Sequence, residues 1–125
     1  MSGNINFNGW LNDDGSENYK CRAWVNFNGT GTVAIRASGN VSSITDNGTG
    51  DYAVNFTTAM PDTNYVAVCG NGQDDSGNGG FRIANPNQVS SKSTASFVRV
   101  VSSYIANGTN RVADDCSFLN VSIFR

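Results

Sequence analysis

Six Asn-Gly pairs divide this chain of 125 residues into short segments, and no other feature of the sequence restricts its fold more strongly. Asn and Gly readily adopt the positive φ angles of the two-residue type I′ turn, which matches the twist of an antiparallel hairpin. We therefore expect a series of β-hairpins. The pairs occupy positions 8–9, 28–29, 47–48, 71–72, 78–79 and 107–108.

The segments between these pairs alternate apolar and polar residues with a period of two, which is typical of strands. In 51–57, for example, Tyr52, Val54 and Phe56 share one face. No stretch of ten or more residues repeats apolar residues at helical spacing. The pattern predicts an all-β fold, an antiparallel β-sandwich or jelly roll of about eight or nine strands. The clearest strands are expected at 23–27, 32–37, 41–46, 51–57, 65–69, 81–84, 97–105 and 119–123.

Two of these strands, 65–69 and 97–105, are apolar on both sides, so we expect both of their faces to be covered. Tyr52 and Tyr65 are predicted to lie in the core, whereas Trp10 and Trp24 fit either a core or an exposed platform. A six-residue segment at 5–10 resembles 25–30, and we interpret both as the same hairpin chemistry.

Length and charge restrict the partners of the chain. A chain of this size forms one domain, and its formal charge is −2, with eight basic residues among ten acidic ones. Proteins that bind nucleic acid usually gather Lys and Arg on one face, so we expect no nucleic-acid partner. No segment approaches the 18 consecutive apolar residues of a membrane span, so no membrane insertion is expected.

The chain contains no histidine, which excludes Ser–His and Cys–His nucleophile pairs and the commonest zinc ligand. The acidic pairs at 13–14, 74–75 and 114–115 lie in turn-like sequence, where Asp is common for local reasons. We expect neither an enzyme nor a cofactor. Cys21, Cys69 and Cys116 are an odd number, so we expect three buried thiols, with one disulfide and a spare thiol as the alternative.

The stretch 74–81 carries half of a calcium-loop pattern. Asp74, Ser76 and Asn78 would supply oxygen ligands at positions 1, 3 and 5, and glycine follows at position 6. Position 12 holds Asn85 instead of a bidentate Glu, and no helix is predicted on either side. We interpret the stretch as a polar hairpin loop, with a calcium site as the weak alternative.

From Cys21 to about Tyr65 the sequence resembles a segment common in tail-fibre proteins of marine and cyanobacterial bacteriophages. The resemblance covers about a third of the chain and is carried by AWVNFNGTGTVAIR at 23–36, NVSSITDNGTGDY at 40–52, VNFTTAMPD at 54–62 and NY at 64–65. The closing VSIF at 121–124 is similar to the last strand of such proteins.

The resemblance implies a homotrimeric β-sandwich head at the outer end of a virion fibre, formed by 21–125, with 1–20 as an attachment and trimer-entry segment. Its partners would be two further copies, other virion proteins and a host cell-surface receptor such as a polysaccharide. The apolar outer side of 97–105 would suit contact with another copy. The start of the chain lacks the pattern of a signal peptide, so we expect synthesis in the bacterial cytoplasm before incorporation into the virion.

Receptor contact is expected in tip loops at 70–80 and 85–93, because loop changes alter specificity without disturbing a sheet. Tail fibres generally carry a long shaft, whereas only about twenty residues precede the matching segment here. A capsid decoration protein that stabilises the shell is therefore one alternative, and a carbohydrate-binding β-sandwich module is another. The expected receptor-binding residues are Asn71, Gln73, Asp74, Asp75, Asn78, Asn87 and Gln88.

Overall fold

The computed structural model of the protein describes residues 4–6, 9–11, 13–16, 20–72, 82–88, 92–106 and 108–125, which form strands and turns only. Within these ranges no helix is long and apolar enough to cross a membrane. The strands are β1 (Asn4–Asn6), β2 (Gly9–Leu11), β3 (Cys21–Asn28), β4 (Ala34–Gly39), β5 (Val41–Gly48), β6 (Asp51–Phe56), β7 (Val66–Gly72), β8 (Arg82–Asn87), β9 (Phe97–Ala106), β10 (Asn110–Ala113) and β11 (Phe118–Phe124).

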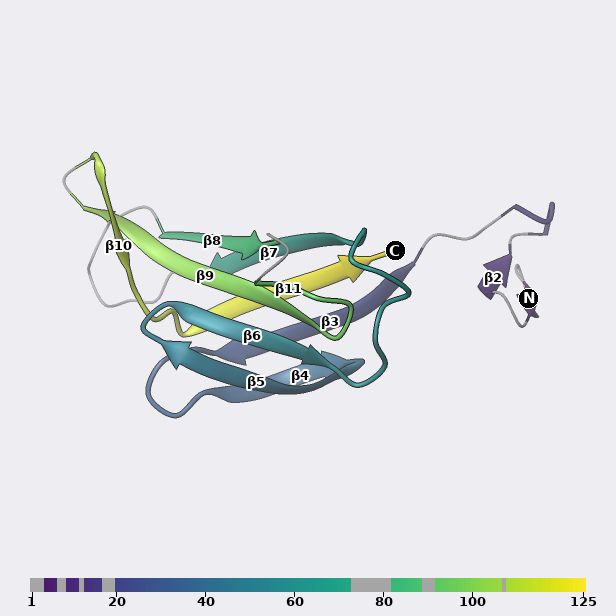
Figure 1. Cartoon of the computed structure of the whole chain (residues 1–125), viewed down its shortest axis with the longest axis horizontal. Helices are drawn as coiled ribbons and strands as arrows, with labels where there is room; N and C mark the ends of the chain where they lie inside the picture. The colour runs from purple at the N-terminus through teal and green to yellow at the C-terminus, as the bar shows by residue number, and fades with distance from the viewer. Residues whose placement is uncertain are drawn as a thin grey trace.

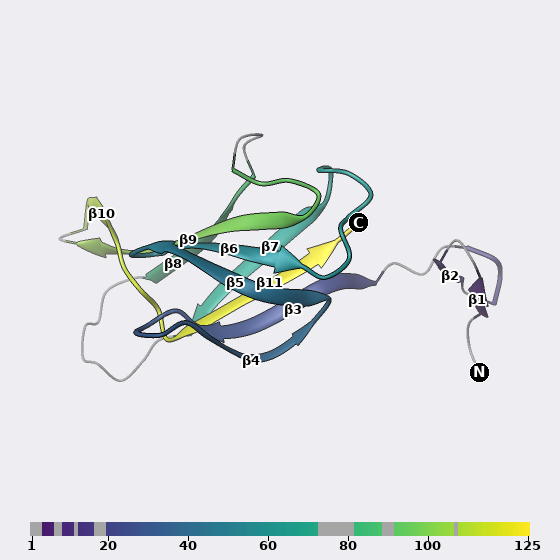
Figure 2. The ribbon, with the colours of Figure 1, turned by 60° about the horizontal axis from the view of Figure 1, so that its bottom comes forward.

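Strands β3 to β11 form two antiparallel sheets that stack as a β-sandwich (Figure 1). One sheet has the order β4-β3-β11-β7. The other has the order β10-β9-β6-β5, and β8 pairs with the other edge of the long strand β9. Figure 2 shows the two sheets as separate layers. The all-β prediction is confirmed, and so is its antiparallel two-sheet arrangement.

A predicted hairpin forms at the Asn-Gly pair 47–48, whereas the pair 71–72 lies inside β7 opposite Leu119 and Phe118, so its prediction as a turn was wrong. Strands β5 and β6 pair with Gly48 opposite Asp51, and Gly48 and Gly50 have φ angles of 130° and 64°. The Asp46 carboxylate accepts a hydrogen bond of 3.0 Å from the amide of Gly48, which fixes the turn. The hairpin predicted from the 5–10 segment is also confirmed, because β1 pairs with β2 and stands apart from the sandwich (Figure 1).

Three expectations about individual strands were wrong. The expected loop 85–93 begins inside a strand, because β8 continues to Asn87 along β9. Strand β4 begins at Ala34, two residues later than expected, and β10 was missed. Strand β10 is four residues long and exposed throughout, so it lacks the buried alternation that marks the other strands.

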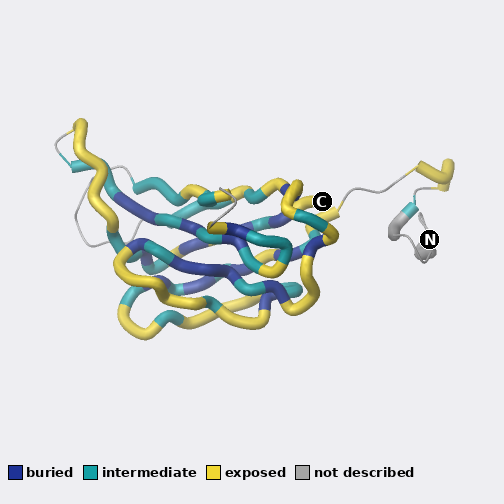
Figure 3. The backbone as a smooth tube through the Cα atoms, in the orientation of Figure 1, coloured by how far each residue is buried: buried dark blue, intermediate teal, exposed yellow. Residues whose placement is uncertain are grey.

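Alternate residues of the central strands fill the space between the sheets. Figure 3 shows buried backbone along β3, β6, β9 and β11 and exposed backbone along β4 and β5. Tyr52 and Tyr65 belong to this core, as predicted. Their rings meet Phe27 and Phe56 edge-on, with centroid distances of 5.3 and 5.8 Å, a geometry that favours aromatic pairs.

The chain enters and leaves the sandwich at the same end, which we call the terminus end (Figure 1). There the Arg22 guanidinium Nε donates a hydrogen bond of 2.7 Å to the carbonyl oxygen of Arg125. The Arg125 guanidinium in turn binds Asp62 with two hydrogen bonds of 2.9 and 2.8 Å and holds the pKa of that carboxyl at about 2. The β3–β4, β5–β6 and β9–β10 turns lie at the opposite end, which we call the loop end (Figure 1).

Candidate functional site

The outer surface of the five-stranded sheet carries a cluster of polar side chains that bind one another, beside the half-buried Phe97 and Val101. The Asn55 amide nitrogen donates to the hydroxyl oxygens of Ser43 and Thr45, at 3.0 and 2.9 Å. Arg99 forms a two-pronged ion pair with Asp51, which lies diagonally across from it on the neighbouring strand β6. This hydrogen-bonded pair holds the pKa of the Asp51 carboxyl below its ordinary value. We call these five side chains the polar face.

The outer surface of the four-stranded sheet instead carries large apolar side chains, with Asn120 and Ser122 between them. Its strand register aligns Val68, Ser122 and Trp24 in one row across β7, β11 and β3. Most of its large side chains are half exposed although they are hydrophobic, and no described element of the chain covers them. These residues, which we call the apolar face, are Val66 (59% exposed), Val68 (55%), Trp24 (44%), Phe118 (43%) and Phe124 (41%).

Two aromatic side chains of the apolar face lie against glycines. Trp24 pairs with Gly39, where an added Cβ atom would fall 2.9 Å from the indole Cδ1 and closer still to Nε1. Phe118 pairs with Gly72, and an added Cβ atom there would meet Phe118 Cβ at 2.8 Å. The absence of a side chain on the neighbouring strand therefore lets each aromatic side chain lie close to the sheet.

An arginine fixes Phe118 from the other side. The Arg36 guanidinium carbon lies 4.1 Å from the ring centroid, within the range of a cation–π contact. The same group donates hydrogen bonds to the Ser117 carbonyl oxygen at 2.6 Å and to Asn26 Oδ1 at 3.1 Å. Arg36 therefore has three partners inside its own subunit.

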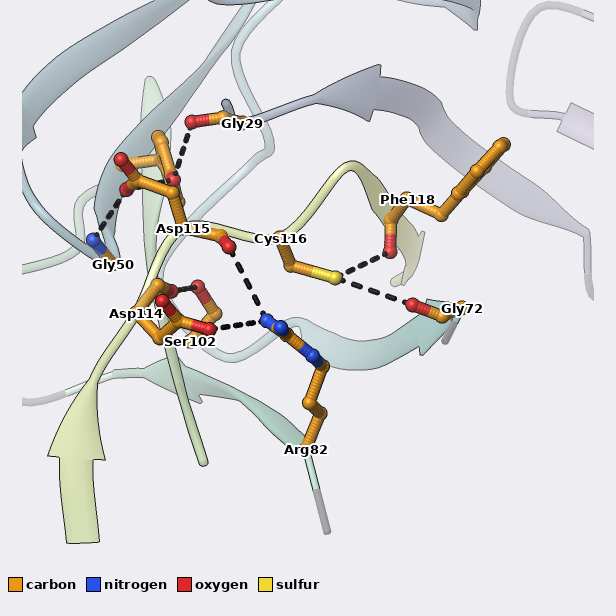
Figure 4. A network of polar contacts seen from close by, with 10 residues as sticks. Gly29, Gly50, Gly72, Arg82, Ser102, Asp114, Asp115, Cys116 and Phe118 are labelled. Carbon is orange, nitrogen blue, oxygen red and sulfur yellow. Dashed lines mark hydrogen bonds and ion pairs between the residues drawn. The ribbon is translucent and has the colours of Figure 1, made fainter. Parts of the chain in front are cut away.

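A network of polar contacts closes the loop end (Figure 4). The Tyr52 hydroxyl lies 2.6 Å from Asp115 Oδ1 and 2.8 Å from the carbonyl oxygen of Gly29. The same carboxylate oxygen accepts a hydrogen bond of 2.8 Å from the amide of Gly50. Burial and the neighbouring Asp115 both raise the pKa of Tyr52, so this phenol stays protonated and acts as a donor.

The second half of the network ties the β10–β11 connection to both sheets. Arg82 pairs with Asp114, and the Ser102 hydroxyl donates to the Asp114 carbonyl oxygen at 2.5 Å. The Cys116 sulfur lies 3.3 Å from the carbonyl oxygens of Gly72 and Phe118 (Figure 4). Every buried side-chain nitrogen or oxygen in the described ranges has a hydrogen-bond partner. This network stabilises the loop end as a rigid support.

The described part of the chain brings together no group of three or more Asp, Glu, Cys or His side chains that would hold a metal ion. The weak calcium site at Asp74, Ser76 and Asn78 lies outside the described residues. The expected thiols differ in environment, since Cys21 is exposed, Cys69 half-buried and Cys116 buried, and all three are free. The prediction of three buried thiols was therefore wrong for Cys21, while burial raises the pKa of Cys69 to about 12.

The three described members of the predicted receptor-binding set do not gather at one tip. Asn71 is half-buried near the end of β7, opposite Leu119. The Asn87 carbonyl oxygen accepts a hydrogen bond of 2.6 Å from Ser93, and the Gln88 amide donates to the Tyr65 carbonyl oxygen at 2.9 Å. Tyr65 precedes β7, so Asn87 and Gln88 lie at the opposite end of that strand from Asn71. The other predicted residues, Gln73, Asp74, Asp75 and Asn78, lie outside the described ranges.

Sequence reasoning missed the apolar face. Because 65–69 is apolar on both sides, we expected both faces of that strand to be covered. This was wrong, because Val66 and Val68 are the most exposed large hydrophobic residues described. The sequence feature that could have indicated this face is the shared composition of the four strands of the sheet. Strands β3, β4, β7 and β11 contain no Asp or Glu, although the chain has ten.

Comparison with known proteins supplies no relative from which a function can be transferred. No family model, no curated protein and no solved structure matches the chain significantly. The function must therefore be argued from the two faces and the two ends of the sandwich.

Proposed function

We propose that this protein is a recognition head of a bacteriophage virion, carried on a tail fibre or appendage as a homotrimer, and that it binds the host surface through its loop end. The observation that carries the proposal is the separation of the two ends. Chain entry and exit meet at the terminus end, where Arg22 contacts Arg125, and the Asn-Gly turns lie at the other end. The sequence resemblance to tail-fibre segments supports the same function.

This separation suits a module that is anchored at one end and binds at the other. The terminus end is where a preceding attachment segment joins β3. At the loop end, the Tyr52–Asp115 network supports the turns from below, so residues in the turns can vary without loss of the scaffold.

The turns offer hydrogen-bonding groups with few charges. Asn47, Thr49 and Thr109 are exposed there, and side chains of this kind suit a neutral polysaccharide on the host surface. Affinity per head would be modest and would rise when several copies on one particle bind together, because linked sites gain from effective concentration.

Three exposed threonines allow a matched test of this orientation. Thr49 and Thr109 lie in turns at the loop end, whereas Thr63 lies at the terminus end, in the β6–β7 connection. We expect the double variant Thr49→Arg/Thr109→Arg to lower binding of the purified protein to host cells at least about 10-fold, a loss of about 1.4 kcal/mol. Thr63→Arg should bind as the original chain does. Equal binding by both variants would contradict the proposal.

The position on the particle separates the proposal from the alternative of a capsid decoration protein. Electron density of the intact virion should place the domain on the tail or an appendage, with the loop end outward. Density on the capsid shell would end the receptor-binding proposal, whatever the cell-binding result.

A further inference from the structure

We propose that the apolar face is the surface through which one copy of this chain packs against a second copy. The inference deepens the proposed assembly, and it rests on the proposed function for the trimer stoichiometry only. The loop-end network uses the backbone carbonyl oxygen of Phe118 but no side chain of this face. Its five large hydrophobic side chains lie on β3, β7 and β11, in the middle and at one edge of the sheet.

The apolar face holds most of the exposed hydrophobic surface that the described residues present. Five of their seven exposed large hydrophobic side chains belong to it, and the other two, Ile35 and Val112, lie on edge strands β4 and β10. Val66 lies opposite Phe124 and next to Val68 on its own strand, and Trp24 lies across Ser122 from Val68. Monomeric proteins rarely leave several large apolar side chains together in water unless they serve as a binding surface. Three copies can bring this same face to a common three-fold axis, so that the apolar side chains of each copy are covered by those of its neighbours.

The size of the face fits a stable contact between subunits. Four strands about 4.8 Å apart and seven residues of about 3.3 Å each give a footprint of about 440 Å². Side chains that stand out from the sheet increase the accessible area above this footprint. This footprint is that of the whole outer surface of the sheet, which holds Asn26, Asn120 and Ser122 beside the apolar face. With its side chains, this outer surface is comparable with the roughly 600 Å² that each partner buries in the smaller stable interfaces.

The charges on this sheet also favour a second copy. Its four strands carry no carboxylate, and their only charged side chains are Arg22 and Arg36. Both guanidinium groups donate to carbonyl oxygens of their own subunit. Burial of the face therefore leaves no carboxylate unpaired, and the face offers little charge to attract an oppositely charged partner.

A bound sugar explains the face less well. Trp24 alone would suit stacking on a sugar ring, but Val66 and Val68 are more exposed than any aromatic residue of the face. Valine offers neither a ring face nor a hydrogen bond to a polyol. Two sheets packed face to face, by contrast, interdigitate side chains of this kind at a spacing of about 10 Å.

The test compares two exposed valines in the full chain by sedimentation velocity and native mass spectrometry. Val68→Glu places a carboxylate in the proposed interface, and Val112→Glu places one on β10, outside it. We expect the original chain and Val112→Glu to assemble at high micromolar concentration. Val68→Glu should be monomeric, with a dissociation constant raised about 100-fold or more, because an unpaired buried charge is costly. Val66→Lys is a second variant with the same expectation, and circular dichroism checks that each variant is folded.

The outcomes separate this inference from the proposed function. A Val68→Glu variant that assembles like the original would overturn the inference alone. A monomeric original chain would overturn both the inference and the proposed trimer, and would leave the cell-binding test of the loop end intact. A dimer that Val68→Glu dissociates would support the interface and contradict the proposed trimer. An assembled Val68→Glu variant that has lost binding to host polysaccharide would make the face a ligand site and would also overturn the inference.

Discussion

The outer surfaces of the two sheets are built from extended strands of similar length, but their side chains are opposite in character. On the polar face, Asn55 binds Ser43 and Thr45, so the hydrogen-bonding groups of three side chains satisfy one another. On the apolar face, valines and aromatic rings occupy the equivalent outward positions and remain half exposed. Antiparallel sheets commonly keep one face in the core and the other in water. Here one of the two outer faces fits that pattern and the other does not.

The exposure of these side chains indicates that the sandwich does not need the apolar face for its own stability. Its core is complete between the sheets, where Phe27, Tyr52 and Leu119 are fully buried. An outward hydrophobic side chain contributes little to folding while it stays in water. Its contribution arises when a partner covers it, so the two faces should respond differently to substitution and to protein concentration.

The largest effect is expected at the glycine that supports Trp24. Gly39→Ala would place a methyl group against the indole, which must then leave the sheet surface, at a cost of about 2 kcal/mol. Urea unfolding would measure the loss of stability, and tryptophan emission would report the displaced ring.

Gly70→Ala is the matched control on the same sheet. An added Cβ atom at Gly70 would meet nothing within 4 Å, and alanine in a strand is favoured over glycine by about 0.5–1 kcal/mol. We expect Gly70→Ala to be neutral or slightly stabilising. Equal destabilisation by both substitutions would show that the indole does not depend on the space above Gly39.

A smaller effect is expected from exchanging the chemistry of the two faces. Asn55→Val removes two hydrogen bonds from the polar face and should lower the free energy of unfolding by about 1 kcal/mol. Val68→Thr on the apolar face should change it by less than about 0.5 kcal/mol when the protein is dilute. Urea unfolding at low concentration measures both. A larger loss for Val68→Thr would contradict the comparison.

The smallest effect concerns the ion pair of the polar face. The hydrogen-bonded Arg99 lowers the pKa of Asp51 from 3.8, so the pair stabilises the fold above that pH and the contribution is lost as the pH falls through the lower, folded-state value. Arg99→Gln should return the NMR titration midpoint of the Asp51 carboxyl towards 3.8. Asp62, paired with Arg125, should keep its midpoint at about 2 in both proteins. An unchanged Asp51 midpoint in Arg99→Gln would show that the pair has no effect on this carboxyl.

Alternation and turn chemistry were enough to predict the hairpins and the inward tyrosines, because both depend on neighbouring residues. They were not enough for β8, where Pro86 makes a strand interior less expected. Among the described strands β8 pairs with β9 only, so it is an edge strand, where proline is tolerated.

The two faces could not be distinguished from the sequence because strand order is a long-range property. Val68 and Trp24 are far apart in the chain and reach the same row only because β11 pairs with both β3 and β7. Long-range contacts also place Asn71 and Gln88 at opposite ends of β7, since Asn71 lies opposite Leu119 and Gln88 binds the Tyr65 carbonyl oxygen. A sequence pattern records which residues face the same way within a strand, but not which strands share a sheet.

The central claim is that a second copy covers the apolar face, and quenching of Trp24 fluorescence tests it most directly. The chain has two tryptophans, so the variant Trp10→Phe would leave Trp24 as its only source of tryptophan fluorescence. We predict that iodide quenches Trp24 freely in dilute protein, as its 44% exposure allows, and much less as the concentration rises into the assembled range. Quenching that stays the same across the whole range would contradict the claim.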